Sequence, residues 1–278
     1  MRKHIRGIDH AVILVRDLDR AEDTYTRLGF NLTPRGYHTL GSENHCLMFG
    51  ADYIELLAVP KPHPAMQYFT DFLATGEGLA AIALATDNAN GAHAELARAG
   101  ISADAPLDFS RPVVLPDGTR DAKFRIVQLA PAVTPGCRTF LCQHFTRNVV
   151  WRPGYMDHAL GVTGIAGIAV MSEEVPQAAK AYAELFDSKP QSIAEGLRVD
   201  TGSAPIAVAG ATQLAARLKE AALPGRPGPQ LAALFFRVAD RGAAANVLRR
   251  GGFKPVALAD GSYAIGADEA NGVALVFG

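Results

Sequence analysis

Two imidazoles and one carboxylate stand in stretches of sequence that otherwise predict buried strands. His10 lies in the apolar run IDHAVILV, Glu55 in DYIELLAV and His144 in TFLCQHFT. A charged group inside such a strand carries a heavy desolvation cost unless a cation or a hydrogen-bonding partner accompanies it. Two imidazoles and a carboxylate with open coordination positions suit a divalent ion such as Zn(II), Ni(II), Co(II), Mn(II) or Fe(II).

Strand geometry predicts which neighbours share a face with these three residues, because side chains alternate with period two. The expected partners are Ile8, Val12 and Leu14 for His10, Tyr53 and Leu57 for Glu55, and Phe140 and Cys142 for His144. Structural roles compete with metal binding at each position. His10 could be a hydrogen-bonded core residue, Glu55 could pair with Arg125, and His144 could donate to a backbone carbonyl.

The elements that must position these residues repeat along the chain. An apolar strand over about 7–15 leads to a polar turn, an amphipathic helix over about 19–28, and Gly29 as the expected helix end. The same pattern returns at 79–100, 162–190 and 231–253, and each copy is followed by two or three further alternating strands. The sequence therefore predicts an α+β fold of four units, each with one strand, one helix and about three strands.

Pairs of units predict two domains. A single unit leaves one sheet face bare, so units must pair to bury it and curve around a shared cleft. The turn-rich stretch 147–161 is the expected boundary, which gives an N-terminal domain over 1–150 with the metal cleft and a C-terminal domain over 160–278. The segment PGRPGP at 224–229 reads as the linker between the third and fourth units.

Composition narrows the function classes. The chain has 278 residues, 49% of them hydrophobic, and a formal net charge of −1, which gives no basic field for nucleic acid. We expect no membrane partner, because no run of about 18 apolar residues is present, and we expect a cytoplasmic protein. Cys46, Cys137 and Cys142 are too few and too scattered for a disulfide framework, so reduced, buried thiols are expected.

The first two units resemble the vicinal oxygen chelate (VOC) superfamily, and within it the glyoxalase-like domain family. The stretches IDHAVILVRDLDRAEDTYTRLGF, RGYHTLGSENHCLMFG and DYIELLAV carry the resemblance, which covers about residues 5–155. It implies four βαβββ units paired into two domains of the glyoxalase, bleomycin-resistance and dioxygenase type. It also implies metal ligands on the first and last strands of paired units, at the positions of His10 and Glu55.

The second unit is expected to complete this site only in part. Alignment of GLAAIALAT with GIDHAVILV places Ala81 opposite His10, so one ligand is missing, whereas His144 takes the position symmetric to Glu55. His38 and His45 are expected to face the same cleft and, with Glu55, to act as acid, base or substrate contacts, with surface or structural roles as the alternative. We expect Arg147, Trp151 and Arg152 to hold an anionic or aromatic substrate through charge and stacking, and the alternative for Trp151 is to anchor the turn between the domains.

The last two units lack such ligands. Ala166 or Gly167 stands where the first-strand ligand is expected, so the C-terminal half is predicted to bind no metal. It is expected to be a structural or dimerising copy, with a homodimer as the resulting assembly, or an apolar binding pocket.

Three functions from different classes remain open for a small-molecule substrate or ligand. The first is a metal-dependent glyoxalase-like lyase or isomerase that stabilises an enediolate. The second is an Fe(II) ring-cleaving dioxygenase of the extradiol type. The third is a non-catalytic binding or resistance protein.

Overall fold

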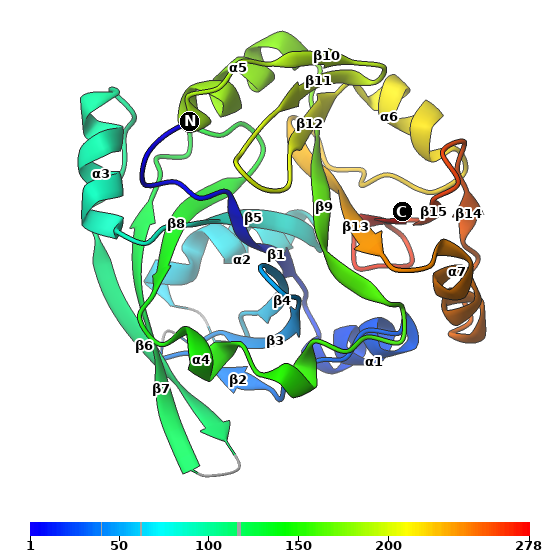
Figure 1. Cartoon of the computed structure of the whole chain (residues 1–278), viewed down its shortest axis with the longest axis horizontal. Helices are drawn as coiled ribbons and strands as arrows, with labels where there is room; N and C mark the ends of the chain where they lie inside the picture. The colour runs from blue at the N-terminus through cyan, green and yellow to red at the C-terminus, as the bar shows by residue number, and fades with distance from the viewer. Residues whose placement is uncertain (40, 62, 116–117) are drawn as a thin grey trace.

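The strands of the chain form two eight-stranded sheets in a computed structural model that describes residues 1–39, 41–61, 63–115 and 118–278 (Figure 1). The first sheet contains β1 (Ile8–Leu14), β2 (Gly36–Tyr37), β3 (Glu43–Met48), β4 (Tyr53–Ala58), β5 (Gly78–Ala85), β6 (Leu107–Leu115), β7 (Gly118–Gln128) and β8 (Arg138–His144). The second contains β9 (Val162–Met171), β10 (Gln191–Ile193), β11 (Gly196–Val199), β12 (Ile206–Ala209), β13 (Gln230–Val238), β14 (Val256–Ala257), β15 (Tyr263–Ile265) and β16 (Ala274–Phe277).

Both sheets have the same strand order, β2-β3-β4-β1-β5-β8-β7-β6 in the first and β10-β11-β12-β9-β13-β16-β15-β14 in the second. Each sheet is thus two four-stranded units joined along their first strands, which run antiparallel. The predicted α+β fold of four units, paired two by two, is confirmed.

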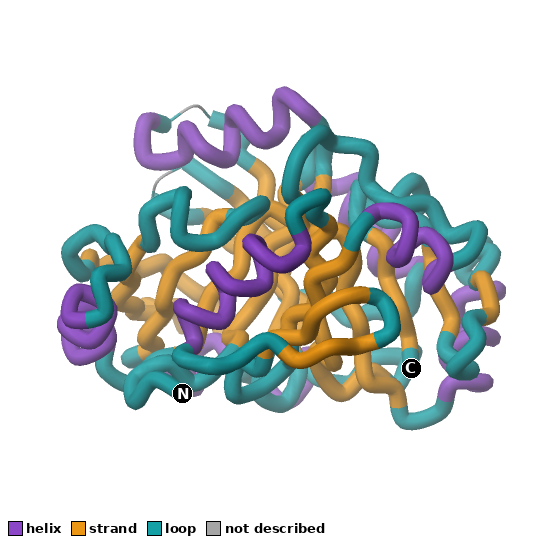
Figure 2. Tube along the Cα trace, turned by 90° about the horizontal axis from the view of Figure 1, so that it is seen from above, coloured by secondary structure: helices purple, strands orange, loops and turns teal. Residues whose placement is uncertain are grey.

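Each unit has one helix between its first and second strands, as the periodicity predicts. These helices are α1 (Leu18–Arg27), α3 (Ala89–Arg98), α5 (Val175–Phe186) and α7 (Arg241–Arg250). The remaining helical segments are α2 (Gln67–Thr75), α4 (Arg147–Val150), α6 (Ala211–Leu218) and two short 3₁₀ turns at Pro64–Met66 and Pro153–Tyr155. Helices lie mainly around the outside of the strand layers (Figure 2).

Local chemistry explains where the helices begin. Asp17, Asn88 and Asp240 each accept a hydrogen bond from a backbone N–H in the first turn of α1, α3 and α7. Such caps satisfy donors that the helix itself leaves unpaired, and each is worth about 1 kcal/mol.

The helix ends follow an equally local rule. Gly29, Gly100 and Gly252 adopt positive φ after three of the helices, where a side chain would be strained. Asp187 takes this conformation in the third unit, which has no glycine there.

The register of β1 and β5 defines the symmetry of the first sheet. His10 pairs with Ala83 and Val12 pairs with Ala81, so a two-fold rotation exchanges His10 with Ala81 and Val12 with Ala83. The sequence alignment that predicts Ala81 as the counterpart of His10 is therefore confirmed. One of the two first strands of this sheet carries an imidazole at this position, and the other carries a methyl group.

A register shift interrupts the first strand of every unit at the same place. The residues skipped at this place are Asp9, Ala80, Ala166 and Ala232, and β9 has a second shift at Thr163. Such a bulge adds one residue to a strand and breaks the strict alternation of side chains. Ile8 accordingly packs in the core cluster between the sheets and not on the cleft face with His10, so the expectation that these two residues share a face is wrong.

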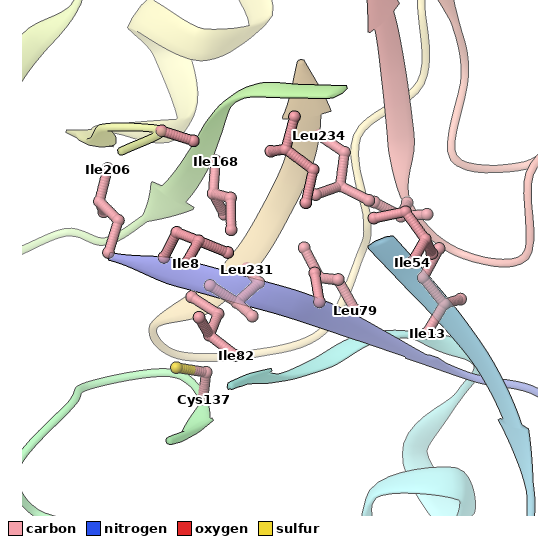
Figure 3. Close-up of a cluster of buried hydrophobic side chains, with 14 of the residues drawn as sticks. Ile8, Ile13, Ile54, Leu79, Ile82, Cys137, Ile168, Ile206, Leu231 and Leu234 are labelled. Carbon is pink, nitrogen blue, oxygen red and sulfur yellow. The ribbon is translucent and has the colours of Figure 1, made fainter. Parts of the chain in front are cut away.

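The main core lies between the two sheets, on the faces opposite their concave clefts. Ile8, Ile13, Leu79 and Ile82 of the first sheet belong to one cluster with side chains of the second sheet, including Ile168 (Figure 3). Figure 3 also labels Ile54, Cys137, Ile206, Leu231 and Leu234 in this cluster. The three cysteines are free and buried, as predicted. This shared core fixes both clefts relative to one another.

Two extra helices cover part of the concave faces. α2 places Phe69, Phe72 and Leu73 against Val12 and its apolar neighbours in the first sheet. α6 does the same in the second sheet with Leu214 and Leu218. Both helices follow the fourth strand of their unit, so the two halves repeat this feature as well. Within the described part of the chain, no helix is long and apolar enough to cross a bilayer.

Candidate functional site

The concave face of the first sheet contains a cavity of about 180 Å³. Three of the residues singled out by sequence line it: His10 from β1, Glu55 from β4, and His38 from the loop after β2. Much of the remaining lining is apolar and includes the rings of Phe69, Phe109, Phe124 and Phe140. A polar corner within an apolar pocket is the usual form of a small-molecule site.

His10 is held from three sides. Its Nδ1 lies 2.7 Å from Asp9 Oδ2, its ring stacks on Tyr53 with centroids 4.3 Å apart, and the edge of Phe140 closes a third side. Its Nε2 faces Glu55, 3.9 Å from Oε2. Because Nδ1 donates to a carboxylate, Nε2 keeps its lone pair directed toward the cavity side.

Asp9 is a buried anion that joins two histidines. The same oxygen that accepts from His10 also accepts from Nε2 of His144 at 3.0 Å. Burial alone would raise the pKa of Asp9, but the hydrogen bonds from both rings outweigh it and hold this pKa well below its usual range. The β1 bulge makes this possible, since it lets adjacent Asp9 and His10 interact on the cleft side.

Glu55 and His38 form the second half of the polar corner. Glu55 Oε1 accepts a hydrogen bond of 2.5 Å from Asn44 Nδ2, and His38 Nε2 lies 3.9 Å from the same oxygen. His38 Nδ1 is 2.8 Å from the hydroxyl of Ser42. Burial lowers the pKa of His38, while the Glu55 carboxylate opposes this shift. The alternative partner considered for Glu55, Arg125, instead forms a two-pronged pair with Asp108.

His144 does not occupy the expected symmetric position. Glu55 pairs with Val12, and the two-fold exchange of Val12 with Ala83 makes Phe140 its counterpart, because Phe140 pairs with Ala83. His144 lies four residues farther along β8, where it contacts Asp9 and the rings of Phe124 and Trp151. It connects to the polar corner through Asp9, Cys142 and Tyr53.

His144 instead belongs to a separate compact group with Asp9 and Cys142. One ligand-type atom of each lies within 4.8 Å of the others, and among the described residues this is the only group of three or more that meets that criterion. Burial raises the pKa of the Cys142 thiol well above its usual value, so the sulfur is protonated near neutral pH. His10, Glu55 and His144 therefore do not converge as one set in this conformation.

Comparison with known proteins assigns the family. The model of the glyoxalase-like domain matches residues 8–186, which is more than half of the chain. The chain belongs to the glyoxalase-like domain family. No protein of curated function matches this sequence significantly.

Solved structures share the fold of this glyoxalase-like protein at low sequence identity. A hypothetical protein from Staphylococcus aureus has a TM-score of 0.68 and 14% identity, with 98% of each chain covered. A fusion of a xylose isomerase-like TIM barrel with 4-hydroxyphenylpyruvate dioxygenase has a TM-score of 0.60 and 18% identity, over 91% of this chain and 40% of the fusion. A mutant of 4-hydroxymandelate synthase from Streptomyces coelicolor has a TM-score of 0.56 and 17% identity, over 91% and 76%. These likenesses establish the fold.

His45 lies away from the cleft of this glyoxalase-like domain. It alternates along β3 with Asn44 and Cys46, and its ring contacts the carbonyl of Thr33 at 2.7 Å and Glu22 of α1 at 3.5 Å. It is therefore on the helix-covered face of the sheet, and the expectation that it faces the cleft is wrong. Because side chains alternate along a strand, Asn44 faces the cleft and the adjacent His45 faces the opposite side of the sheet.

The predicted substrate contacts at 147–152 lie at the edge of the site. Trp151 donates its indole N–H to the carbonyl of Phe49, and Arg147 stacks on the Trp151 ring at 3.4 Å. Trp151 contacts Tyr53 and His144 edge-on, so it backs the polar corner without lining the cavity. Arg152 lines a different hollow of about 200 Å³ near β6.

Four residues with a role in the site are not among those predicted: Asp9, Ser42, Asn44 and Arg111. Asp9 was overlooked because strict alternation places it on the opposite face from His10, although a carboxylate in an apolar strand is the same signal that identifies Glu55. Arg111 of β6 lines the cavity and lowers the pKa of His38 by its charge. Arg111 thus places a cationic side chain at the cavity wall, where the sequence predicted Arg147 and Arg152.

Proposed function

We propose that this protein is a metal-dependent lyase or isomerase of the glyoxalase-like type, acting in the first cavity on a small substrate with two neighbouring oxygens. One observation carries the proposal. His10 Nε2 and His38 Nε2 both face the carboxylate of Glu55 at 3.9 Å, one on each oxygen. We therefore propose His10, His38 and Glu55 as the protein ligands, with His38 in the place that sequence reasoning gave to His144.

The donor set fits a divalent ion. Two atoms that share one ion at about 2.0–2.2 Å are separated by about 3.0–3.6 Å, so each histidine must approach Glu55 by less than about 1 Å. The two rings must also move toward one another, because the three ligand atoms do not all lie within 4.8 Å of each other in this structure. The second nitrogen of each ring already has a partner, Asp9 for His10 and Ser42 for His38. Such outer contacts fix the tautomer and direct the free nitrogen toward an ion.

Each residue has a definite task in this proposal. A bound Zn(II), Ni(II), Co(II), Mn(II) or Fe(II) would act as a Lewis acid that polarises the carbonyl of the substrate. Glu55 accepts the proton from the adjacent carbon through one oxygen, and the hydrogen bond from Asn44 keeps that carboxylate oriented. Arg111 supplies the positive charge for an anionic group of the substrate.

The cavity limits the size of the substrate. Its volume of about 180 Å³ is below the range of about 300–1,000 Å³ that holds drug-sized ligands. The polar corner is itself largely buried, with the His10 and Glu55 side chains 5% and 12% exposed, which strengthens electrostatic interactions there. We infer a small oxygenated substrate with an apolar portion.

A matched pair of histidine variants tests the proposal. His38→Ala should abolish stoichiometric binding of Ni(II), Co(II) or Zn(II), measured by calorimetry and by metal analysis after dialysis. His45→Ala removes a buried imidazole on the opposite face and should leave metal binding unchanged. Equal affinity in His38→Ala and the unaltered protein would refute the ligand set.

Activity then separates the reaction classes. Metal-loaded protein should convert the hemithioacetal of methylglyoxal, or another 2-oxoaldehyde adduct, with loss of activity on chelation. If stoichiometric metal binds and no adduct is converted, the lyase or isomerase proposal fails. If no metal binds, the non-catalytic binding function takes its place.

An Fe(II) ring-cleaving dioxygenase is the second candidate. Two imidazoles and one carboxylate with open positions are the set that oxygen-activating iron enzymes use, and the rings of Phe109 and Phe124 offer an aromatic substrate a matching wall. Oxygen consumption by the Fe(II)-loaded protein with catechol distinguishes this reaction, since the lyase or isomerase consumes no oxygen.

A further inference from the structure

The concave face of the second sheet contains a larger cavity than the first, with a volume of about 340 Å³. It lies on the opposite side of the shared core from the His10 site, among β9, β12, β13 and β16, and α6 contributes to its wall. We propose that this cavity is a second small-molecule site, which takes an uncharged planar aromatic compound with a hydrogen-bonding group on one edge. This inference does not rest on the proposed function of the first cleft.

The register shows why the second cavity is open. In β9 and β13, Gly167 pairs with Phe235 and Ala169 pairs with Ala233, which repeats the relation of His10 to Ala83 and of Val12 to Ala81. Gly167 is therefore the counterpart of His10. Ala207 pairs with Ala169 just as Glu55 pairs with Val12, so Ala207 is the counterpart of Glu55.

The bulge completes the correspondence between the two clefts. Ala166 is skipped in β9 as Asp9 is skipped in β1, and Ala166 and Gly167 both line the second cavity. The positions of an aspartate, a histidine and a glutamate in the first cleft thus carry no more than a methyl group in the second. Loss of these side chains leaves a floor of small residues, which accounts for the greater volume.

The shape of this floor favours a flat ligand. Ala166, Gly167 and Ala207 present almost no relief above the backbone, and Ala169 and Ala209 lie beside them under Leu214 of α6. The ring of Phe235 stands at the side of this floor as a wall. A planar ring can contact both surfaces at once, and aromatic pairs add to the gain from burial alone. The volume falls within the range of about 300–1,000 Å³ typical of ligand sites.

The charges at the rim are balanced. Arg217 donates to Glu195, lies 3.5 Å from Asp260 through Nη2, and covers the Phe235 ring at 5.1 Å. Arg198 also lines the cavity and pairs with Asp200 outside it. Two arginines and two carboxylates therefore face the cavity, each with a charged partner, while Arg217 Nε remains a buried donor without a hydrogen bond.

This balance selects an uncharged ligand over an ion. A charged ligand would have to displace an existing partner or remain uncompensated next to an apolar floor, which carries a desolvation cost. The carboxylates of Glu195 and Asp260 keep acceptor lone pairs, and the guanidinium of Arg198 keeps donors. An amide or hydroxyl on the ring edge can use both kinds of group.

A probe set with one ring and different charges tests the inference. Benzamide is the uncharged planar probe, benzoate and benzamidine carry opposite charges, and cyclohexanecarboxamide keeps the amide without the planar ring. Binding is followed by saturation-transfer NMR and by titration of protein signals. Benzamide should bind with a dissociation constant of about 1 mM or tighter, and the other three probes at least about fivefold more weakly.

Two substitutions at one position locate the binding. Ala207→Phe fills the floor from a half-buried site and should weaken benzamide binding by more than about tenfold, whereas Ala207→Ser keeps the volume and should change it by less than about twofold. A thermal melt confirms that each variant folds, and Ala207→Leu serves if the phenylalanine variant does not.

Three results would contradict the inference. Benzamide binding that survives Ala207→Phe unchanged would place the ligand elsewhere and overturn the inference, as would the absence of saturable binding. Tighter binding of benzamidine or benzoate than of benzamide would overturn the assignment of an uncharged ligand. Loss of metal binding in the first cleft would not affect any of these results.

Discussion

The two concave clefts share a backbone plan and differ in the side chains that fill it. In the first, a bulged strand presents Asp9 and His10, and the neighbouring strand presents Glu55. In the second, the same positions hold Ala166, Gly167 and Ala207. Strand order, bulge and covering helix are preserved, so the fold requires none of the ionisable groups. We therefore attribute the ionisable groups of the first cleft to the function proposed for it.

The polar corner also depends on hydrogen bonds among its own ionisable groups, which the second cleft does without. A buried carboxylate such as Asp9 stays ionised only because two imidazoles surround it. The alanines at the corresponding positions need no such partners. Substitutions made in matched pairs, one in each half, test this difference between the two clefts.

The largest effect is expected in the core that the two halves share. Leu79→Ala in the first sheet and Leu231→Ala in the second each create a cavity in this core, and each should lower the free energy of unfolding by about 2–5 kcal/mol. Denaturant unfolding followed by fluorescence and circular dichroism measures both. If one substitution shifts only part of the unfolding transition, the two halves unfold separately. The shared core is then not the main contact that holds them together.

The next effect separates the clefts by their chemistry. Glu55→Gln keeps the shape of β4 and removes the charge, and it should weaken binding of a divalent ion by more than about 100-fold, beyond the 10–100-fold typical of residues behind the ligands. Ala207→Gln introduces the same amide in the second cleft and should leave metal affinity unchanged. Calorimetric titration with Ni(II) or Zn(II) compares the two variants. Similar losses in both would mean that the ion does not bind at Glu55.

A pH effect is expected where the two halves meet at Asp52. Burial raises the pKa of Asp52 to about 6, although the N–H of Ile165 and the charge of Arg237 oppose the shift. A carboxyl whose pKa is higher in the folded state stabilises the fold below its unfolded pKa and loses this contribution as the pH rises through 6.

The Asp52 effect can be isolated with one variant. Between pH 4 and pH 7 the unaltered protein should lose about 2 kcal/mol of stability relative to Asp52→Asn, which does not titrate. Urea unfolding at a series of pH values gives this difference directly. A constant difference across the range would show that Asp52 titrates alike in the folded and unfolded chain.

The smallest of these effects concerns the bulge residue of β1. Asp9→Asn keeps the size of the side chain but weakens the hold on His10, and it should lower metal affinity by about 10–100-fold. Ala166→Asn, its counterpart in the second cleft, should have no effect on metal binding. Titration of both variants with the same ion measures these affinities. An unchanged affinity in Asp9→Asn would remove Asp9 from the support of the site.

The fold can be predicted from local patterns because each unit has the same sequence features. Strand alternation, a capping carboxylate or amide, and the glycines at 29, 100 and 252 recur with the same spacing. The third unit lacks the glycine, and Asp187 adopts the required conformation in its place. Repetition of the whole pattern outweighed this local exception.

The candidate site was predicted only in part, because register and bulges are tertiary features. His10, His38 and Glu55 line the cavity as expected. His45 does not, since it is one residue out of phase with the cleft face of β3, and His144 is four residues beyond the true counterpart of Glu55. The β1 bulge, which brings Asp9 beside His10, leaves no mark in the alternation of apolar residues. The predicted limits of the two domains and the absence of metal from the second half remain predictions.

Because the bulge is repeated, the side chains of the first cleft can be placed at matching positions in the second. Since β9 already has the backbone that turns two consecutive residues toward a cleft, Ala166→Asp, Gly167→His and Ala207→Glu would place the strand-borne groups of the first cleft at the corresponding positions of the second, next to the ring of Phe235. Gly167 has no positive φ, and a Cβ there would meet its nearest neighbour at 3.4 Å, an ordinary contact. The second half is in this sense a second template, on which the side-chain set of the first cleft can be built while the first cleft keeps its own.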